Sequence, residues 1–282
     1  MRLLAKLPLW FLYAFSDFLF LVLFYIWGYR KKVVTDNLEK CFPDKSQSER
    51  RIIARKFYRH LCDVVVEVIK GHHISKKELK KRARITNPEV LREVIDKGQS
   101  ALALTSHQCN WEWIILGCSA EYDFPLDALY KPLSNRYFDQ FMLEVRGRFG
   151  NTPVATRNIV REIIRRKSVQ RAFGILADQT PTKGQEKFWL QFMGRNTPFF
   201  TGSQKLAELT GYPVLFVSMC KKKRGYYEIS FQKLATPPYQ KGGDFIARSY
   251  ASKVESQIRK QPECYLWSHR RWKFTKSVQG ES

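Results

Sequence analysis

The chain has 282 residues, of which 44% are hydrophobic and 14% aromatic, a composition that excludes a disordered protein and allows a sizeable core. Lysine and arginine number 49 against 26 acidic residues, so the formal net charge is +23 at pH 7, and an anionic partner is expected, either nucleic acid or an anionic membrane surface. The six cysteines form no CxxC pair and no zinc-ligand spacing, which favours a reducing, cytoplasmic environment and gives no sign of a metal site.

The first segment of the chain, residues 7–27, is apolar and reads LPLWFLYAFSDFLFLVLFYIW, with Asp17 as its only charged residue. As a helix it would be about 30 Å long, which is the thickness of the hydrocarbon core of a bilayer. A secretory signal peptide is a poorer match, because GYRKK follows the segment where a cleavage site of small residues would stand. Residues 1–32 are therefore predicted to be a membrane anchor, and a membrane is favoured over nucleic acid as the partner.

Asp17 leaves the manner of anchoring open, because a carboxylate is costly at the centre of a bilayer. A helix that spans the membrane and a helix that lies in its interface are both compatible with the segment. The basic residues 30–32, together with the basic and disulfide-poor remainder, place the rest of the chain on the cytoplasmic face.

Residues 33–84 are predicted to be a helical segment that packs on the domain after it. Apolar side chains recur at helical spacing over residues 33–70, and Ser46 or Ser48 is suited to cap the start of a helix. Residues 71–84 are basic and polar, and they are expected to form a surface connection.

From residue 85 to residue 282, short apolar runs alternate with helical patterns, which predicts an α/β domain with a mostly parallel central sheet flanked by helices. The last two runs are suited to an antiparallel pair. The expected strands are residues 101–105, 126–130, 172–177, 213–220 and 226–234, and the expected helices are residues 88–97, 111–120, 134–148, 157–167, 198–210 and 244–260.

Two titratable residues, His107 and Asp178, directly follow two of these strands, and sites in such sheets gather beyond the carboxyl ends of the strands. Glu112 stands five positions after His107, and the two can meet only if the histidine lies in the turn between strand and helix, because residues five apart on a helix point about 140° apart. By spacing alone, a hydrogen-bonded turn histidine remains the alternative to a catalytic pair. Cys109 beside the histidine raises a thiol nucleophile as a further option, which no other local feature supports.

The stretch SHQCNWEW (residues 106–113) resembles the His-x4-Asp/Glu block of the glycerophospholipid-type acyltransferases, and within them the late acyltransferases of bacterial lipid A biosynthesis. Further stretches are similar to that branch in the expected order: residues 129–150, GILADQTP (174–181), residues 188–214 and PECYLWSHRRWK (262–273). The resemblance covers nearly the whole chain, so it implies the glycerolipid acyltransferase-like fold and an acyltransferase domain over residues 85–282.

The resemblance also implies roles for single residues. His107 would be the general base that removes the proton of an acceptor hydroxyl, and Glu112 would orient it. Asp178 would be a second catalytic or acceptor-positioning group.

Arg146 and Arg148 would bind an acceptor phosphate or the developing negative charge, since the planar guanidinium group contacts two oxygens at once. Gln179, next to Asp178, would assist in substrate binding.

The reaction that the resemblance implies needs no metal or other cofactor. The donor would be an acyl carrier protein thioester or acyl-CoA, and the acceptor an anionic lipid A precursor at the cytoplasmic face of the inner membrane. Two alternatives stay open: another lipid acceptor, such as a lysophospholipid or an aminolipid, and a basic membrane-anchored binding protein without catalysis. No nucleic-acid-binding signature is found in the sequence.

Overall fold

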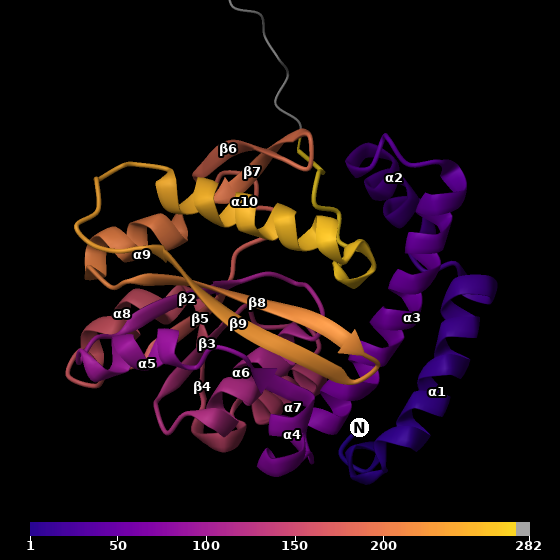
Figure 1. Cartoon of the computed structure of the whole chain (residues 1–282), viewed down its shortest axis with the longest axis horizontal. Helices are drawn as coiled ribbons and strands as arrows, with labels where there is room; N and C mark the ends of the chain where they lie inside the picture. Colours follow the sequence, from indigo (N-terminus) through magenta and orange to yellow (C-terminus); the bar gives the residue numbers. More distant parts are fainter. Residues whose placement is uncertain (275–282) are drawn as a thin grey trace, which may run out of the picture.

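The computed structural model describes residues 1–274. At its centre lies a seven-stranded sheet in the order β1-β9-β8-β2-β5-β3-β4, in which all neighbouring strands run parallel except β8 and β9 (Figure 1). This confirms the predicted α/β class and the antiparallel pair late in the chain. The strands are β1 (Ala83–Ile85), β2 (Ala101–Thr105), β3 (Leu126–Tyr130), β4 (Thr152–Ala155), β5 (Ala172–Leu176), β8 (Val214–Lys223) and β9 (Tyr226–Ala235).

Helices cover both faces of the sheet, which explains why the central strands are apolar throughout. In β2, Leu102 and Leu104 pack in the cluster beneath α10 (Phe245–Lys260), whereas Ala101 packs in the cluster of α6 (Trp111–Glu121) on the other face. Figure 1 shows α10 and α9 on one side of the sheet and α6 on the other. The other flanking helices are α5 (Glu89–Asp96), α7 (Arg136–Arg146), α8 (Ile159–Arg165) and α9 (Gly202–Thr210).

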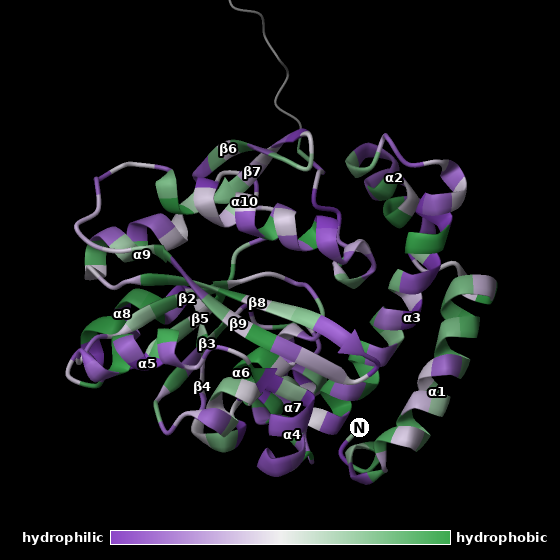
Figure 2. Cartoon of the chain, in the orientation of Figure 1, coloured by the Kyte–Doolittle hydropathy of each residue, from purple (hydrophilic) through white to green (hydrophobic). Residues whose placement is uncertain are grey.

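The N-terminal part of the chain is helical, as predicted. An apolar helix α1 (Leu9–Leu21) continues into a π-helical stretch η2 (Val22–Trp27), and α2 (Lys31–Cys41) and α3 (Gln47–Gly71) follow. Ser46 caps α3 in a capping box with Glu49. Helix α1 lies along α3, and much of α1 is hydrophobic in Figure 2.

Residues 71–84 differ from the surface connection that was expected. They form α4 (Lys76–Arg82), which Ser75 caps, and the start of the edge strand β1. The physical reason is that Leu79 and Ala83 are buried against α6 and β9, so two apolar residues anchor an otherwise polar stretch.

Two further strands and one edge strand lie outside the predicted set. Residues 187–200 form an antiparallel hairpin of β6 (Lys187–Phe192) and β7 (Arg195–Phe200), so α9 begins at Gly202 and not near residue 198. The edge strand β4 is only four residues long and contains Pro153, a residue that is tolerated at sheet edges but weakens a strand prediction.

Candidate active site

His107 lies in the turn between β2 and α6, and Glu112 lies in the first turn of α6, as the spacing argument requires. The turn is fixed from both ends. Asn110 caps α6 through its side chain, which accepts a hydrogen bond from the backbone N–H of Trp113 at 3.1 Å. The backbone carbonyl of His107 accepts from the N–H of Leu266, so the C-terminal segment also holds the turn.

The side chain that orients His107 is Asp178. Its Oδ1 lies 2.7 Å from the ring Nδ1, and its Oδ2 accepts the backbone N–H of His107 at 3.0 Å. The contact follows from the sheet, because β2 and β5 are parallel neighbours with Thr105 opposite Leu176, and each polar residue stands just beyond its strand. Since a carboxylate only accepts, Nδ1 carries the proton and the lone pair is on Nε2.

Asp178 is buried, with only 2% of its surface exposed. Burial raises the pKa of its carboxyl, but the positive charge that His107 carries when protonated and the two hydrogen bonds from His107 outweigh burial, and the net pKa lies below the usual value. The neighbouring Arg271 guanidinium lowers it further. Asp178 is therefore ionised at neutral pH and can stabilise a positive charge on the imidazole.

Gln179 occupies the other side of the ring. Its amide Nε2 lies 3.1 Å from Nε2 of His107, a contact in which the amide donates to the imidazole lone pair. The same nitrogen is the one that a general base uses. Gln179 thus occupies the position directly in front of the Nε2 lone pair of His107.

Glu112 is expected from the motif to orient His107, but both of its carboxylate oxygens bind Arg146 instead. Nε and Nη2 of Arg146 lie 2.8 and 2.5 Å from the two oxygens, a bidentate pair at the mouth of the cavity. Burial lowers the pKa of Arg146, but the Glu112 charge raises it more, so the net shift is upward. Glu112 does not orient His107 because the register of the β2–β5 pairing brings Asp178 to Nδ1 of the histidine.

The two arginines of the motif are placed differently. Arg146 lines the cavity beside His107. Arg148 donates through Nη1 to the carbonyl of Gly71 at the end of α3, at 2.6 Å, and stacks on Phe149. Arg148 therefore ties α3 to the segment after α7.

A cavity of about 760 Å³ opens beside His107 and extends between α6 and the sheet. Its mouth is polar, with His107, Gln179 and Arg146. Its inner part is lined by apolar or small residues from both layers: Ala103, Ile115, Cys118, Leu126, Gly174, Val217 and Phe231. Motif reasoning missed this chamber, although small residues at the α6-facing positions of two central strands, Ala103 and Gly174, are the signal that marks it.

Cys109 points away from the cavity. Its thiol is buried and donates to the carbonyl of Met219 at 3.2 Å. Burial raises the pKa of this thiol well above its usual range, which disfavours the thiolate that a nucleophile needs. Within residues 1–274, no group of three or more His, Cys, Asp or Glu side chains is arranged to hold a metal ion.

Glu67 of α3 connects the turn that carries His107 with the N-terminal helix. This fully buried carboxylate accepts hydrogen bonds from Asn110 at 2.8 Å, from Tyr227 of β9 at 2.7 Å and from Tyr13 of α1 at 2.8 Å. Burial raises the pKa of Glu67 despite these three donors.

A mostly parallel sheet, a histidine–aspartate pair at its carboxyl edge and a largely apolar chamber beside the histidine together suit an enzyme that handles an acyl chain. Comparison with known families agrees: the model of the bacterial lipid A biosynthesis acyltransferases matches residues 1–274. The chain belongs to this family, and it is an acyltransferase.

Curated relatives carry matching names. The chain is 27% identical over 258 residues to the lipid A biosynthesis palmitoleoyltransferase of Escherichia coli K12, covering 90% of this chain and 81% of the relative. It is 25% identical over 248 residues to the lipid A biosynthesis lauroyltransferase of the same organism, covering 86% and 79%. A lipid A biosynthesis acyltransferase of Haemophilus influenzae is 24% identical over 240 residues, covering 82% and 72%.

Proposed function

We propose that this protein transfers a fatty acyl chain from an acyl thioester to a hydroxyl group of a lipid A precursor, with His107 as the general base. The observation that carries the proposal is the state of His107, whose Nδ1 is held by a buried carboxylate and whose Nε2 lone pair is at a cavity with an apolar interior. The names of the relatives support the acceptor.

The reaction assigns one proton transfer in each direction to His107. Nε2 takes the proton of the acceptor hydroxyl while its oxygen attacks the thioester carbonyl carbon, and the C–S bond then breaks. The leaving thiolate takes the proton back from Nε2, so the products are an ester and a free thiol. Asp178 stabilises the imidazolium that exists between these steps, and this role replaces the one that the motif gives to Glu112.

Gln179 and Arg146 are proposed to serve the substrates. A hydroxyl group that reaches Nε2 displaces the Gln179 amide, whose N–H is then available to the oxygen on which negative charge develops. Glu112 holds Arg146 through Nε and Nη2, which leaves Nη1 of the guanidinium to bind an acceptor phosphate. Arg148 is left with a structural role, because its contact is with Gly71.

The chamber is proposed to hold the acyl chain of the donor. Its volume of about 760 Å³ falls within the usual range of small-molecule sites, and its inner walls are apolar. The donor is expected to be an acyl carrier protein thioester or acyl-CoA.

The N-terminal helix is proposed to lie in the interface of the inner membrane at the cytoplasmic face. Residues 9–27 have a mean hydropathy of 2.0 and are long enough to cross a bilayer, but Asp17 forms an ion pair with Arg224 of the β8–β9 turn at 2.9 Å. Ser16 is buried and donates to Asp63 of α3 at 2.8 Å. A spanning helix would break both contacts, whereas an in-plane helix keeps them and buries its outer face in lipid. That face consists of Trp10, Phe11, Phe15, Phe18, Leu21, Tyr25, Ile26 and Trp27.

The proposal is tested with purified protein, acyl carrier protein thioesters of several chain lengths and a panel of lipid acceptors. We expect acylation of the lipid A precursor and its loss, by at least about 10³-fold, in His107→Ala. Cys109→Ser is the matched control in the same turn and should remain active. If lysophosphatidate is acylated and the lipid A precursor is not, the proposed acceptor is wrong. If His107→Ala is fully active, the proposed general-base mechanism is wrong.

A further inference from the structure

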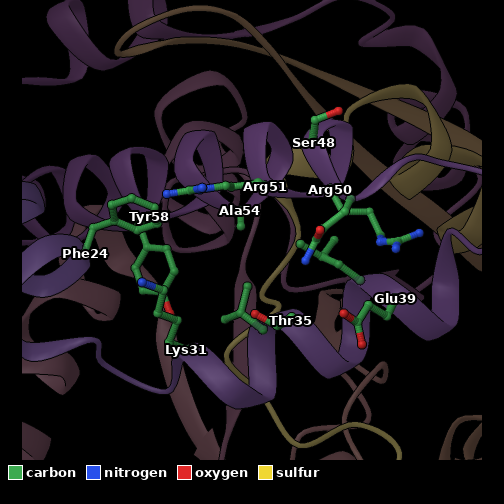
Figure 3. Close-up of a pocket in the computed structure, with 12 residues that line it drawn as sticks. Phe24, Lys31, Thr35, Glu39, Ser48, Arg50, Arg51, Ala54 and Tyr58 are labelled. Atoms are coloured by element: carbon green, nitrogen blue, oxygen red, sulfur yellow. The ribbon is translucent and has the colours of Figure 1, made fainter.

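A second cavity lies where the apolar N-terminal segment ends, bounded by η2, α2 and α3 (Figure 3). Its volume is about 440 Å³, and none of its lining residues is shared with the active-site cavity. It therefore has no place in the acyl transfer described above.

One part of its lining is apolar. Phe24 of η2 packs against Tyr58 of α3 with ring centroids 5.3 Å apart, and Val34, Leu38 and Ala54 continue this surface between the helices. A phosphate ion alone would gain nothing from these side chains, whereas a hydrocarbon chain would.

The other part of its lining is cationic. Lys31, Arg50 and Arg51 line the cavity against a single carboxylate, that of Glu39. Figure 3 shows Lys31 on the Phe24 side and Arg50 and Glu39 toward the opposite end.

Among the described residues, Lys31 and Arg51 lack the carboxylate partners that neighbouring basic residues have. Lys45 and Arg59 on either side pair with Glu49 and Asp17. Over residues 1–274, no carboxylate forms an ion pair with Lys31 or Arg51. Arg50 is different, because its Nη1 donates to the backbone carbonyls of Phe42 and Lys45.

The position of the cavity suits a membrane lipid. The residues just before it, Tyr25, Ile26 and Trp27, are exposed and apolar, and the basic residues 30–32 follow after two intervening residues. In a membrane-associated chain, this change from aromatic to basic residues lies at the level of the phosphate groups.

We propose that this cavity binds one anionic glycerophospholipid of the membrane. Lys31 and Arg51 bind its phosphate, and one acyl chain lies against Phe24, Val34 and Ala54. The lipid is a ligand and not a substrate, and it fixes η2 against α2 and α3. The inference goes beyond the proposed acyl transfer and rests only on membrane association of the N-terminal segment.

The test measures lipid binding to the full-length protein in neutral detergent by native mass spectrometry. Phosphatidylglycerol, phosphatidylcholine and inorganic phosphate are titrated separately. We expect one phosphatidylglycerol to bind, phosphatidylcholine to bind at least about tenfold more weakly, and phosphate not to displace the lipid. Equal binding of the two lipids, or displacement by phosphate, would overturn the proposal.

Two variants assign the binding to this cavity. Lys31→Gln with Arg51→Gln should weaken phosphatidylglycerol binding about tenfold, whereas Arg55→Gln with Lys56→Gln, the same charge change at α3 residues outside the cavity, should not. Ala54→Leu fills the cavity without changing charge and should also weaken binding. An equal loss in the control pair would mean general attraction to a basic surface and refute the site.

Acyl transfer is measured in parallel, so that failure of this site and failure of the proposed function can be told apart. The Lys31 and Arg51 double variant should retain acyl transfer in detergent micelles. His107→Ala should bind phosphatidylglycerol as the unchanged protein does.

Discussion

The exchange Asp178→Asn separates the two carboxylates that compete for the role of orienting His107. Asp178 accepts two hydrogen bonds from His107, one from the backbone N–H and one from Nδ1. Asparagine has only one acceptor atom. When its oxygen accepts from the backbone, its NH₂ group faces Nδ1, and the ring proton must move to Nε2, where it blocks the base.

The expected loss is large, because both the tautomer and the charge are wrong. Asp178 is buried and lies 2.7 Å from the ring, so little solvent screens the imidazolium from the missing carboxylate. The same exchange beside the histidine of serine proteases lowers kcat about 10⁴-fold, and that corresponds to about 5 kcal/mol of activation free energy. We expect a decrease of about 10³- to 10⁴-fold here.

Glu112→Gln is the matched comparison. It weakens the bidentate contact with Arg146 and leaves the ring of His107 in place, so we expect about a 10- to 100-fold loss that falls mainly on KM for the acceptor. The assay is steady-state acyl transfer with both substrates varied, and the thermal midpoint of each variant serves as the folding control. A folded Asp178→Asn enzyme with more than a tenth of the activity, beside an inactive Glu112→Gln enzyme, would refute this assignment.

Three other changes test separate parts of the structure. Gly174→Val should shift the preferred donor toward shorter acyl chains, by about tenfold in the ratio of the kcat/KM values for short and long chains. The reason is that a Cβ at this position fits, 3.9 Å from Ile115, and the valine methyl groups project into the chamber. An unchanged chain-length preference would refute the proposal that the chamber holds the acyl chain. Arg224→Gln leaves Asp63 and Asp17 without their shared partner and should lower the free energy of unfolding in detergent by about 2 kcal/mol; an unchanged urea midpoint would contradict the ion pair's importance. Burial lowers the pKa of His60 to about 3 and that of His269 to about 4, so between about pH 6.5 and 4 the unfolded chain binds protons that the folded chain does not. The free energy of unfolding should therefore decrease as the pH is lowered through this window, by at most about 1.4 kcal/mol per pH unit for each histidine. In urea titrations, His60→Gln should make this decrease less steep.

The strands that carry the site could be predicted because each is a short apolar run followed by a polar residue. The runs before His107 and Asp178 are buried by helices on both sides and leave no polar face to confuse the pattern. The β6–β7 hairpin is harder to predict, because Pro198 lies inside β7 and its strands lie outside the main sheet.

The partners inside the site depend on register and could not be read from spacing. The five-residue separation of His107 and Glu112 permits a contact but does not say which group approaches Nδ1. Asp178 is 71 positions away in sequence and reaches Nδ1 because β2 and β5 are parallel neighbours. Predicting this contact requires the order of the strands in the sheet, which a local sequence pattern does not reveal.

The hydrogen bonds to Glu67 bear on how a soluble form of this enzyme could be made. Deleting α1 would remove Tyr13 and leave one oxygen of a fully buried carboxylate without a donor, at the residue that also holds Asn110 at the start of α6. A truncated protein would therefore be expected to lose order at the turn of His107 as well as the apolar surface that is proposed to face lipid. Replacing outward residues such as Phe18 and Ile26 by polar ones keeps the inner face of the helix intact and is the better route to crystals.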